Sequence, residues 1–439
     1  MRKIRVGLIG LGTVGRAVAE VLLKSSDLIR ERVGAEVVPH RAADLDLGRA
    51  RGLELEPKSL TTDARAILED PEVDIVVELI GGIEPAREYI AEAIRGGKSV
   101  VTANKALLAE RGEELFRAAS EAGVDLGFEA SVGGGIPIIR ALREGFAANR
   151  IKLLYGIVNG TSNYILSKMA EEGREFQDVL QEAQQRGYAE ADPSLDVDGI
   201  DSAHKIVILS SLAFGTRVRL ENVLTEGIRH ITPLDIAFAR ELGYRIKPLG
   251  IAKKVDEALE VRVHATMLPE SNPISQVKGV YNAIYVDGDR VDPNMFVGKG
   301  AGGMPTASAV VGDIIELSRN LLRGASGRVP PASCLMKHLK DMTILEPGRI
   351  TSCYYLRFSA LDRPGVLSKI SGVLGEHDIS IAAVIQHGRA DEGSFVPVVM
   401  TTHEATEENV RGALRKIDEL DIIGEPTVLI RVESGEGLT

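Results

Sequence analysis

Short apolar runs alternate with amphipathic stretches along the first third of the chain. The runs at 3–10 and 74–82 are compact and end in glycine, which predicts buried strands. The stretches at 13–26 and 85–97 place apolar residues at helical spacing, and the second begins with proline and ends with two glycines. This alternation predicts a doubly wound, parallel α/β sheet with helices on both faces. We expect a Rossmann-like domain over residues 1–136.

The pattern changes beyond residue 137. Several amphipathic helices come first, and apolar strands follow between 222 and 297. This mixture predicts an α+β domain over residues 137–304. A long helix with an apolar stripe is expected at 305–324, and we expect it to pack back on the first domain.

The last part of the chain has the composition of a linker followed by a separate domain. Residues 325–350 are rich in glycine, proline and serine, which is typical of a linker. Residues 351–434 then show the order βαββαβ, which predicts a ferredoxin-like unit with its own core. The 439 residues are thus expected to form several domains.

Composition and charge narrow the class of protein. The net charge of −11 disfavours binding to nucleic acid or to an anionic membrane, and no apolar run approaches membrane-spanning length. The first residues lack the pattern of a secretory signal, and two cysteines do not make a disulfide framework. We therefore expect a cytoplasmic protein with no nucleic-acid or membrane partner.

A glycine-rich motif, GLGTVG, follows the first predicted strand and opens the first predicted helix. It fits G-x-G-x-x-G, a pattern that is weak alone but more specific in this strand–helix context. The first glycine permits a tight turn, the second lets the backbone approach a pyrophosphate, and the third lets helix and strand pack closely. The motif predicts dinucleotide binding through Gly10, Leu11, Gly12, Thr13, Val14 and Gly15.

The residues after the second predicted strand leave the choice between NAD and NADP open. An acidic residue there favours the ribose hydroxyl groups of NAD, and a basic residue favours the phosphate of NADP. Asp44 and Asp46 are acidic, whereas Arg41 is basic. Arg41 is the candidate ligand for the phosphate.

Acid–base chemistry is expected to fall to lysine and carboxylate side chains. Cys334 and Cys353 lie in or beyond the linker, and the histidines form no zinc-binding cluster, so neither a thiolate nucleophile nor a catalytic zinc is expected. Lys105 follows a predicted strand, at the edge where doubly wound sheets bind ligands. Lys205 lies four residues after Asp201 on a predicted helix, although an exposed ion pair also explains this spacing.

Five carboxylates crowd into the segment EADPSLDVDGIDSAHK, residues 190–205. They are Glu190, Asp192, Asp196, Asp198 and Asp201. The residue types are compatible with a metal site, a solvated loop or a pocket for a cationic substrate.

Several longer motifs make the chain similar to a known family. They are GLIGLGTVG, VVTANK, FEASVGGGIPI, GIVNGTSNYIL, GYAEADPSLDVDGIDSAHK and GKGAGGMPTASAVVGD, in the family's order. The chain resembles the monofunctional homoserine dehydrogenases that carry a C-terminal ACT domain. The resemblance covers essentially the whole chain. It implies reversible NAD(P)H-dependent reduction of L-aspartate 4-semialdehyde to L-homoserine, in threonine, methionine and isoleucine biosynthesis, with a central domain for substrate binding and dimerisation.

The resemblance also implies roles for individual residues. Lys205 matches the proton donor, and Lys105 matches an assisting lysine between nicotinamide and substrate. Glu190 and Asp201 match substrate-binding carboxylates, with Asp196 nearby. Further cofactor contacts are implied for Gly187, Glu190, Gly300 and Gly302.

A monovalent cation site, usually sodium in the family, matches the carboxylate of Glu129 and the backbone carbonyls of Val132, Gly134 and Ile136. From residue types alone, a glycine-rich turn into a helix explains this segment equally well. Many relatives carry a basic residue where this chain has Ala43. That departure weakens the expectation of NADP, unless Arg41 or Lys58 takes the place of the missing cation.

The segment LDRPGVLSKISGVLGEHDISIAAVIQHG resembles the start of an ACT domain. Asp362 begins its D-x-P-G-V-L pattern, and Gly365 opens a helix whose backbone N–H groups could meet an amino-acid effector. The family suggests threonine as that effector and a homodimer or homotetramer as the assembly, while a purely structural module is the alternative. Two other functions stay open: another lysine-using amino-acid dehydrogenase, and a non-catalytic nucleotide or amino-acid sensor.

Overall fold

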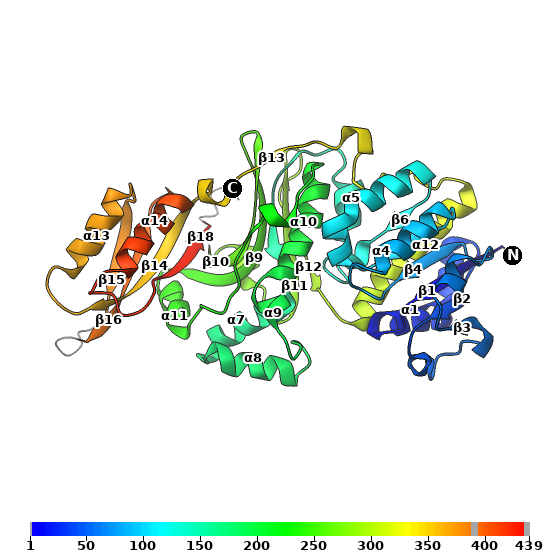
Figure 1. Cartoon of the computed structure of the whole chain (residues 1–439), viewed down its shortest axis with the longest axis horizontal. Coiled ribbons are helices and arrows are strands. Elements are labelled where there is room, and N and C mark those ends of the chain that lie inside the picture. Colours follow the sequence, from blue (N-terminus) through cyan, green and yellow to red (C-terminus); the bar gives the residue numbers. More distant parts are fainter. Residues whose placement is uncertain (1, 388–393, 434–439) are drawn as a thin grey trace. The chain divides into compact units, whose positions relative to one another are not determined.

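The computed structural model describes residues 2–387 and 394–433 (Figure 1). The chain folds into two compact units, each assembled from three segments. Unit 1 comprises Met1–Leu154, Ala203–Glu221 and Tyr281–Met342. Unit 2 comprises Tyr155–Ser202, Asn222–Val280 and Thr343–Thr439. Residue 434, the last of the predicted C-terminal domain, lies outside the described residues.

A parallel six-stranded sheet forms the centre of unit 1. Its order is β3-β2-β1-β4-β5-β6, and each neighbouring pair is parallel. The order reverses at β1, so the carboxyl ends of β1 and β4 form a topological switch point, where open α/β sheets bind ligands. The strands are β1 (Lys3–Ile9), β2 (Glu36–Ala43), β3 (Leu60–Thr61), β4 (Ile75–Glu78), β5 (Ser99–Thr102) and β6 (Leu126–Gly127). The predicted Rossmann-like fold is confirmed.

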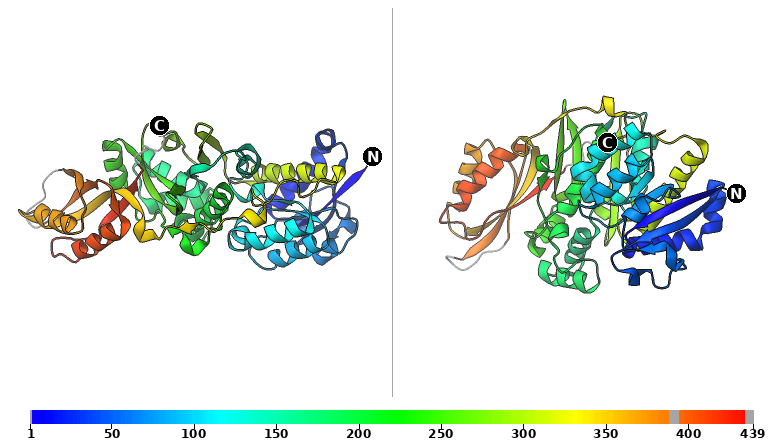
Figure 2. Two further views of the ribbon diagram at one scale, coloured as in Figure 1. Left: turned by 90° about the horizontal axis from the view of Figure 1, so that it is seen from above. Right: turned by 45° about the vertical axis from the view of Figure 1, so that its right-hand side comes forward.

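The long helix α12 packs on the N-terminal helix α1, although almost three hundred residues separate them (Figure 2). Val310 and Ile314 of α12 share one buried core with Val18 and Leu22 of α1. The helices described for unit 1 are α1 (Thr13–Lys24), α2 (Ser26–Val33), α3 (Arg65–Leu68), α4 (Ala86–Arg95), α5 (Lys105–Ala122), α6 (Ile138–Arg140) and α12 (Gly303–Arg323), with most of α10 (Ile200–Phe214).

The two units do not follow the domain boundaries that the hydrophobic pattern predicts, because each unit contains segments from distant parts of the chain. The antiparallel pair β11 (Tyr281–Gly288) and β12 (Asn294–Lys299) folds with unit 1, although it precedes the predicted boundary at 304. Strand β7 (Ile151–Ile157) carries the chain from unit 1 into unit 2. Periodicity reports local structure, whereas the units reflect packing between distant segments.

Unit 2 contains a mixed sheet in the order β9-β10-β18-β14-β16-β15. Strands β9 (Tyr244–Val255) and β10 (Ala258–Pro269) form a long antiparallel hairpin. Strand β18 (Val428–Val432) pairs in parallel with β10 and antiparallel with β14. The C-terminal sheet therefore continues the strands from the middle of the chain. The other elements before it are α7 (Gly160–Glu172), α8 (Phe176–Gln185), α9 (Ser194–Val197), β8 (Leu224–Thr225) and α11 (Pro233–Glu241).

The C-terminal part of unit 2 has the predicted βαββαβ order. Its elements are β14 (Thr351–Leu361), α13 (Val366–Glu376), β15 (Ile381–Gln386), β16 (Phe395–Thr402), α14 (Glu407–Asp418) and β18. The short strand β17 (Ala405–Thr406) pairs with β14, whereas β13 (Thr343–Ile344) pairs with β10. Tyr354 and Phe358 of β14 pack with Ile370 of α13 and Val410 of α14 in a separate buried core. The ferredoxin-like prediction is confirmed.

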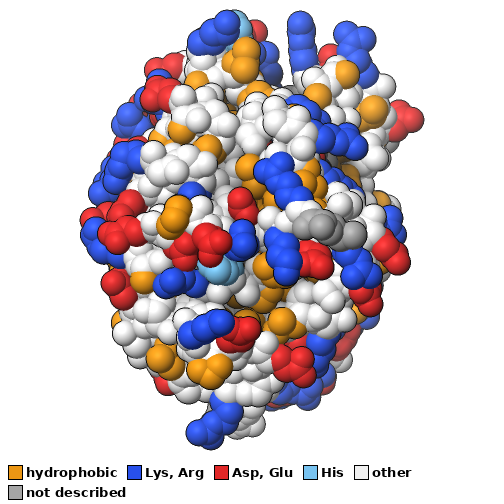
Figure 3. All heavy atoms as spheres, turned by 90° about the vertical axis from the view of Figure 1, so that its right-hand side faces the viewer, with side chains coloured by type: hydrophobic (Ala, Val, Ile, Leu, Met, Phe, Trp, Pro, Cys, Tyr) orange, Lys and Arg blue, Asp and Glu red, His pale blue; other side chains and the backbone are white. Residues whose placement is uncertain are grey.

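The surface of the protein carries charges of both signs. Figure 3 shows Lys and Arg side chains interspersed with Asp and Glu over the face that it presents. Within residues 2–387 and 394–433, no helix combines the length and the apolar character that a membrane crossing requires.

Candidate active site

The glycine-rich loop lies between β1 and α1 at the switch point. Gly10 has φ +100°, and a Cβ there would lie 2.9 Å from the backbone of Leu79. A Cβ on Gly15 would overlap the carbonyl oxygen of Gly10. A Cβ on Gly12 would meet nothing within 4 Å, so packing inside the protein does not require glycine at that position. The open space beside Gly12 suits a ligand that approaches the backbone closely.

A second glycine loop lies against the first. Gly303, the first residue of α12, lies so close to Thr13 that an added Cβ would be 3.2 Å from the threonine methyl group. Gly302 has φ +118°, and a Cβ on Gly134 would lie 2.6 Å from the carbonyl group of Gly300. Unit 1 thus brings together the glycine-rich motif, Gly300 and Gly302, and the segment that contains Glu129.

The end of β2 approaches the glycine-rich loop through Asp44. Its Oδ2 accepts a hydrogen bond of 2.6 Å from the Leu11 N–H, and its Oδ1 accepts one of 2.9 Å from the Asp46 N–H. Partial burial raises the pKa of Asp44, but these N–H groups and the nearby Arg49 outweigh burial and hold the pKa below its ordinary value. The Arg49 side chain is 53% exposed, and its Nη1 is 3.4 Å from Asp44 Oδ2.

Arg41, the sequence-based candidate for a phosphate ligand, is engaged elsewhere. Its Nε lies 2.6 Å from Oδ2 of Asp70, a carboxylate that also faces His40 Nε2 at 3.4 Å. Arg41 is therefore partly neutralised on β2, while Arg49 is the more exposed arginine beside the loop.

Lys105 is the first residue of α5 and is half-buried. The preceding Asn104 caps the helix, accepting from the Leu107 N–H at 3.1 Å. Glu78, at the end of β4, accepts a hydrogen bond of 2.6 Å from the Thr102 hydroxyl at the end of β5. The carboxyl ends of two parallel strands are thereby tied together, and Lys105 lies at this edge as predicted.

Asn159 joins two of the crowded carboxylates of unit 2. Its Nδ2 donates to Asp196 Oδ1 at 2.7 Å and to Asp201 Oδ2 at 2.9 Å. Its Oδ1 accepts from the Ser162 N–H at 2.8 Å and so caps α7. One amide therefore orients both carboxylates without adding a positive charge to them.

The remaining carboxylates of the segment have other partners or lie exposed. Asp198 forms an ion pair with Arg229, with Oδ2 3.0 Å from Nη2. Asp192 accepts from the Ser194 N–H at 3.1 Å in a local turn. Asp192 and Asp198 therefore have structural roles.

Gly187 and Glu190 lie in the exposed loop that follows α8. Gly187 has φ +73° with open space around it. The Thr161 hydroxyl donates to the Tyr188 carbonyl at 2.7 Å, and Gln184 Nε2 donates to the Glu190 carbonyl at 3.0 Å. This loop is thus attached to the start of α7, next to Asn159.

Asp201 and Lys205 lie one turn apart on α10, with 5% and 8% of their surface exposed. An ion pair in water would leave both side chains much more exposed. The interpretation of this spacing as an exposed surface pair is therefore wrong.

Glu129 is a buried carboxylate at the start of a loop that leads into α6. Its oxygens accept from the backbone N–H groups of Ile139 at 2.8 Å and Arg140 at 2.9 Å. Burial, followed by the charge of Asp313, raises the pKa of Glu129 to about 7. Burial likewise raises the pKa of Asp313 to about 6. The loop also contains the backbone carbonyls of Val132, Gly134 and Ile136, so oxygen ligands for a hard cation are concentrated here.

In the C-terminal domain, Gly365 precedes α13 as its N-terminal cap and has φ +89°. A Cβ there would meet nothing within 4 Å. The Asp362 N–H donates to the Ser394 carbonyl at 3.0 Å, joining the loop to the strand that follows.

A hollow of about 590 Å³ lies between α5 and α10 in unit 1. Phe116, Leu212 and Arg217 are among its lining residues. None of the predicted site residues is among the described residues that line it.

Two site residues were missed by the sequence interpretation. Asn159 lies in GIVNGTSNYIL, where an asparagine directly before GTS signals a helix cap and no more. Asp313 ends GKGAGGMPTASAVVGD on an apolar-striped helix, and a carboxylate on the apolar side of such a helix is a signal of a buried partner.

Comparison with known families accounts for most of the chain. The family described as homoserine dehydrogenase matches residues 137–315. The NAD binding domain of homoserine dehydrogenase matches residues 10–129, and the ACT domain matches residues 354–419.

Individual proteins match over the full length. The homoserine dehydrogenase of Neisseria gonorrhoeae is 45% identical over 434 residues, covering 99% of both chains. That of Pseudomonas aeruginosa is 43% identical over 439 residues, again covering 99% of both. The crystal structure of a homoserine dehydrogenase from Thiobacillus denitrificans superposes with a TM-score of 0.92 at 48% identity, covering 99% of each chain. A hyperthermophilic archaeal homoserine dehydrogenase in complex with NADPH covers 72% of this chain and 98% of its own, with a TM-score of 0.62 and 29% identity.

These matches agree with the motifs, the parallel sheet and the C-terminal βαββαβ domain. They confirm the resemblance inferred from the sequence, and they remove the support for a non-catalytic sensor or a different amino-acid dehydrogenase. The chain, with its NAD(P)-binding domain and C-terminal ACT domain, belongs to the homoserine dehydrogenase family, the oxidoreductases of aspartate-family amino-acid biosynthesis.

Proposed function

We propose that Lys205 is the proton donor in the reversible reduction of L-aspartate 4-semialdehyde to L-homoserine. The observation that supports this assignment most is the burial of Asp201 and Lys205 one turn apart on α10. NAD(P)H, when bound, supplies hydride to the aldehyde carbon. The aldehyde oxygen then becomes negative, and the Lys205 ammonium group stabilises this charge and transfers a proton to it.

Lys105 assists Lys205 in this proposal. It lies at the edge formed by the carboxyl ends of the parallel strands, where folds of this type bind their nucleotide cofactor. A second ammonium group there adds to the field that stabilises the developing alkoxide. In the reverse direction, the same lysines accept and position the proton of the homoserine hydroxyl.

Asp201 and Glu190 bind the ammonium group of the amino-acid substrate, with Asp196 beside Asp201. The partners of the carboxylates support this division of roles. Asn159 orients Asp196 and Asp201 through neutral N–H groups, which add no positive charge to compete with an ammonium group.

The cofactor is proposed to contact both glycine loops. Its contacts are Gly10, Leu11, Gly12, Thr13, Val14, Gly15, Lys105, Gly187, Glu190, Gly300 and Gly302. The open space at Gly12 supports this assignment, because an added side chain would fill the approach to the backbone.

NADP is the proposed preferred cofactor, and the NADPH complex of the archaeal relative supports it. Arg41 remains a candidate for the 2′-phosphate, but its ion pair with Asp70 competes for the same charge. Arg49 is the better placed cation, since it is exposed and lies beside Asp44 at the glycine-rich loop.

A sodium ion is proposed to bind Glu129 and the carbonyls of Val132, Gly134 and Ile136. Each Glu129 oxygen accepts one backbone hydrogen bond and retains a second lone pair for a ligand. A cation there would also offset the electrostatic repulsion between the buried carboxylates of Glu129 and Asp313.

Threonine is proposed as an effector that binds the ACT domain near Asp362 and Gly365. The open space and left-handed backbone at Gly365, at the start of α13, support a ligand that meets backbone N–H groups. The functional assembly is proposed to be a homodimer or homotetramer.

Replacement of Lys205 by alanine tests the proton donor. Lys205→Ala is expected to lower kcat for aldehyde reduction roughly a hundredfold or more, while the dissociation constant of NADPH stays unchanged. Lys168→Ala is the matched control, because Lys168 is a helical lysine with a carboxylate, Glu172, four residues away. Turnover is measured from NADPH oxidation, and wild-type turnover in Lys205→Ala would eliminate the assigned role.

Replacement of Asn159 by serine tests the substrate carboxylates. Serine keeps the helix cap but removes both donors to Asp196 and Asp201. The KM for the aldehyde is expected to rise about ten- to a hundredfold, because hydrogen bonds to charged groups contribute ~1.5–3 kcal/mol. The melting temperature serves as the control for folding, and an unchanged KM in a folded variant would contradict the assignment.

Two arginine variants test the cofactor phosphate. Arg49→Ala is expected to raise the KM for NADPH about tenfold, equivalent to ~1.4 kcal/mol, and to leave the KM for NADH unchanged. Arg41→Ala is expected to change neither KM as much. The reverse order of effects would transfer the role to Arg41.

Sodium titration tests the cation site. Sodium at about one hundred times its dissociation constant is expected to stabilise the wild type by ~2.7 kcal/mol in thermal unfolding, compared with tetramethylammonium at the same ionic strength. Glu129→Gln removes the charged ligand and is expected to lose this response. Equal responses in wild type and variant would place the effect elsewhere.

A further inference from the structure

A short segment of unit 2 contacts the backbone between Asp196 and Asp201, the carboxylates proposed to bind the substrate. We call residues 226–229 the strap and residues 190–202 the substrate segment. The Ile228 N–H of the strap donates to the Val197 carbonyl at 2.8 Å. A Cβ on Gly227 would overlap that same carbonyl oxygen, so the two backbones touch. Arg229 of the strap also forms the ion pair with Asp198.

These contacts fall between the two carboxylates that Asn159 orients. Val197 follows Asp196 directly, and Asp198 lies three residues before Asp201. The backbone of Gly199 also approaches the Glu226 carbonyl, with an added Cβ at 3.1 Å. The position of the strap therefore constrains the spacing of Asp196 and Asp201.

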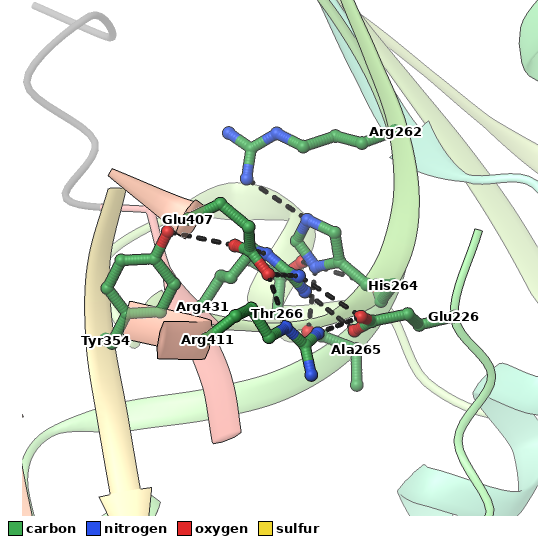
Figure 4. A network of polar contacts seen from close by, with 9 residues as sticks. All are labelled: Glu226, Arg262, His264, Ala265, Thr266, Tyr354, Glu407, Arg411 and Arg431. Carbon is green, nitrogen blue, oxygen red and sulfur yellow. Dashed lines mark hydrogen bonds and ion pairs between the residues drawn. The ribbon is translucent and has the colours of Figure 1, made fainter. Parts of the chain in front are cut away.

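The strap is held on its other side by a buried arginine of the ACT domain. Arg431, on β18, is only 1% exposed, and its Nη1 and Nη2 lie 2.8 and 3.2 Å from the two carboxylate oxygens of Glu226 (Figure 4). The same guanidinium group donates from Nε to Glu407 Oε2 of α14 at 2.9 Å. Arg411 of α14 also contacts both Glu226 and Glu407.

The positive and negative charges around Arg431 are paired with one another. Two arginines face two glutamates, and the Tyr354 hydroxyl donates to Glu407 at 2.9 Å. Burial raises the pKa of Glu226 and of Glu407, but Arg431 and Arg411 together outweigh burial and hold both pKa values below the ordinary value. Both carboxylates are therefore charged near neutral pH, and Arg431 links them.

The backbone reinforces this link. The Glu226 N–H donates to the Val263 carbonyl of β10 at 2.8 Å, and Arg431 pairs with Thr266 on the same strand. Glu226, the first residue of the strap, and the ACT strand β18 thus both hydrogen-bond to strand β10. The Glu226 side chain connects this shared strand to helix α14 through the two arginines.

We propose that Arg431 and Glu226 are positioning residues for the substrate segment, so that the ACT domain supports substrate affinity even without an effector. The path runs from Arg431 of β18 to Glu226, along the strap to Val197 and Asp198, and so to Asp196 and Asp201. The inference rests on the proposed assignment of those two carboxylates to substrate binding.

Two isosteric substitutions of the partners of Arg431 test this proposal. Glu226→Gln weakens the link to the strap, whereas Glu407→Gln weakens the same arginine's link within the ACT domain. Glu226→Gln is expected to raise the KM for L-aspartate 4-semialdehyde by about three- to tenfold, with kcat and the KM for NADPH within about twofold of wild type. Glu407→Gln is expected to change these constants by less than twofold. An unchanged KM in Glu226→Gln, or equal shifts in both variants, would overturn the proposal in favour of a purely structural network.

A measurement without turnover separates this inference from the proposed function. Amide hydrogen exchange over residues 196–202 is expected to be faster in Glu226→Gln than in Glu407→Gln. If the wild type does not reduce the aldehyde, the proposed function fails, and the exchange rates alone decide the positioning role: equal rates reject it. Should Glu226→Gln fail to fold, Arg229→Gln releases the exposed end of the strap from Asp198, with the same rise in KM and exchange expected and wild-type values rejecting the proposal.

Discussion

A carboxylate that leaves water must find a hydrogen-bond donor inside the protein, and this requirement organises both units. Where one donor serves two carboxylates, it also joins the elements that carry them. Asn159 does so for Asp196 and Asp201, and Arg431 does so for Glu226 and Glu407. The amide orients its pair without adding a positive charge, whereas the guanidinium group adds a positive charge beside its pair. The first arrangement suits the binding of a cation, and the second suits attachment.

A second buried carboxylate, Asp235, also joins the ACT domain to the rest of unit 2 through hydrogen-bond donors. Asp235 of α11 is fully buried, and its oxygens accept hydrogen bonds from Arg357 of β14 at 2.6 and 3.1 Å and from the Tyr355 hydroxyl at 3.1 Å. Breaking a buried pair leaves an uncompensated charge, which costs about 3–5 kcal/mol. The ACT domain is therefore fixed to the rest of unit 2 by directional contacts as well as by the pairing of β18 with β10.

Local patterns predicted most of the fold. The alternation of strands and helices, the position of Lys105 after a strand and the C-terminal βαββαβ order all depend on neighbouring residues. The interactions that complete the site depend on distant ones. Asn159 and Asp201 are 42 residues apart, Glu129 and Asp313 are 184 apart, and Glu226 and Arg431 are 205 apart. Spacing rules cannot predict such contacts, because the topology of the sheets decides which segments meet.

The helix α10 has one further consequence. It carries Asp201 and Lys205 on one continuous helix, Ile200–Phe214. Their separation along the axis is four residues of helix, about 6 Å. A single inserted residue between them would rotate Lys205 by about 100° away from the side of Asp201, so the proposed roles of these two residues depend on their four-residue spacing along α10.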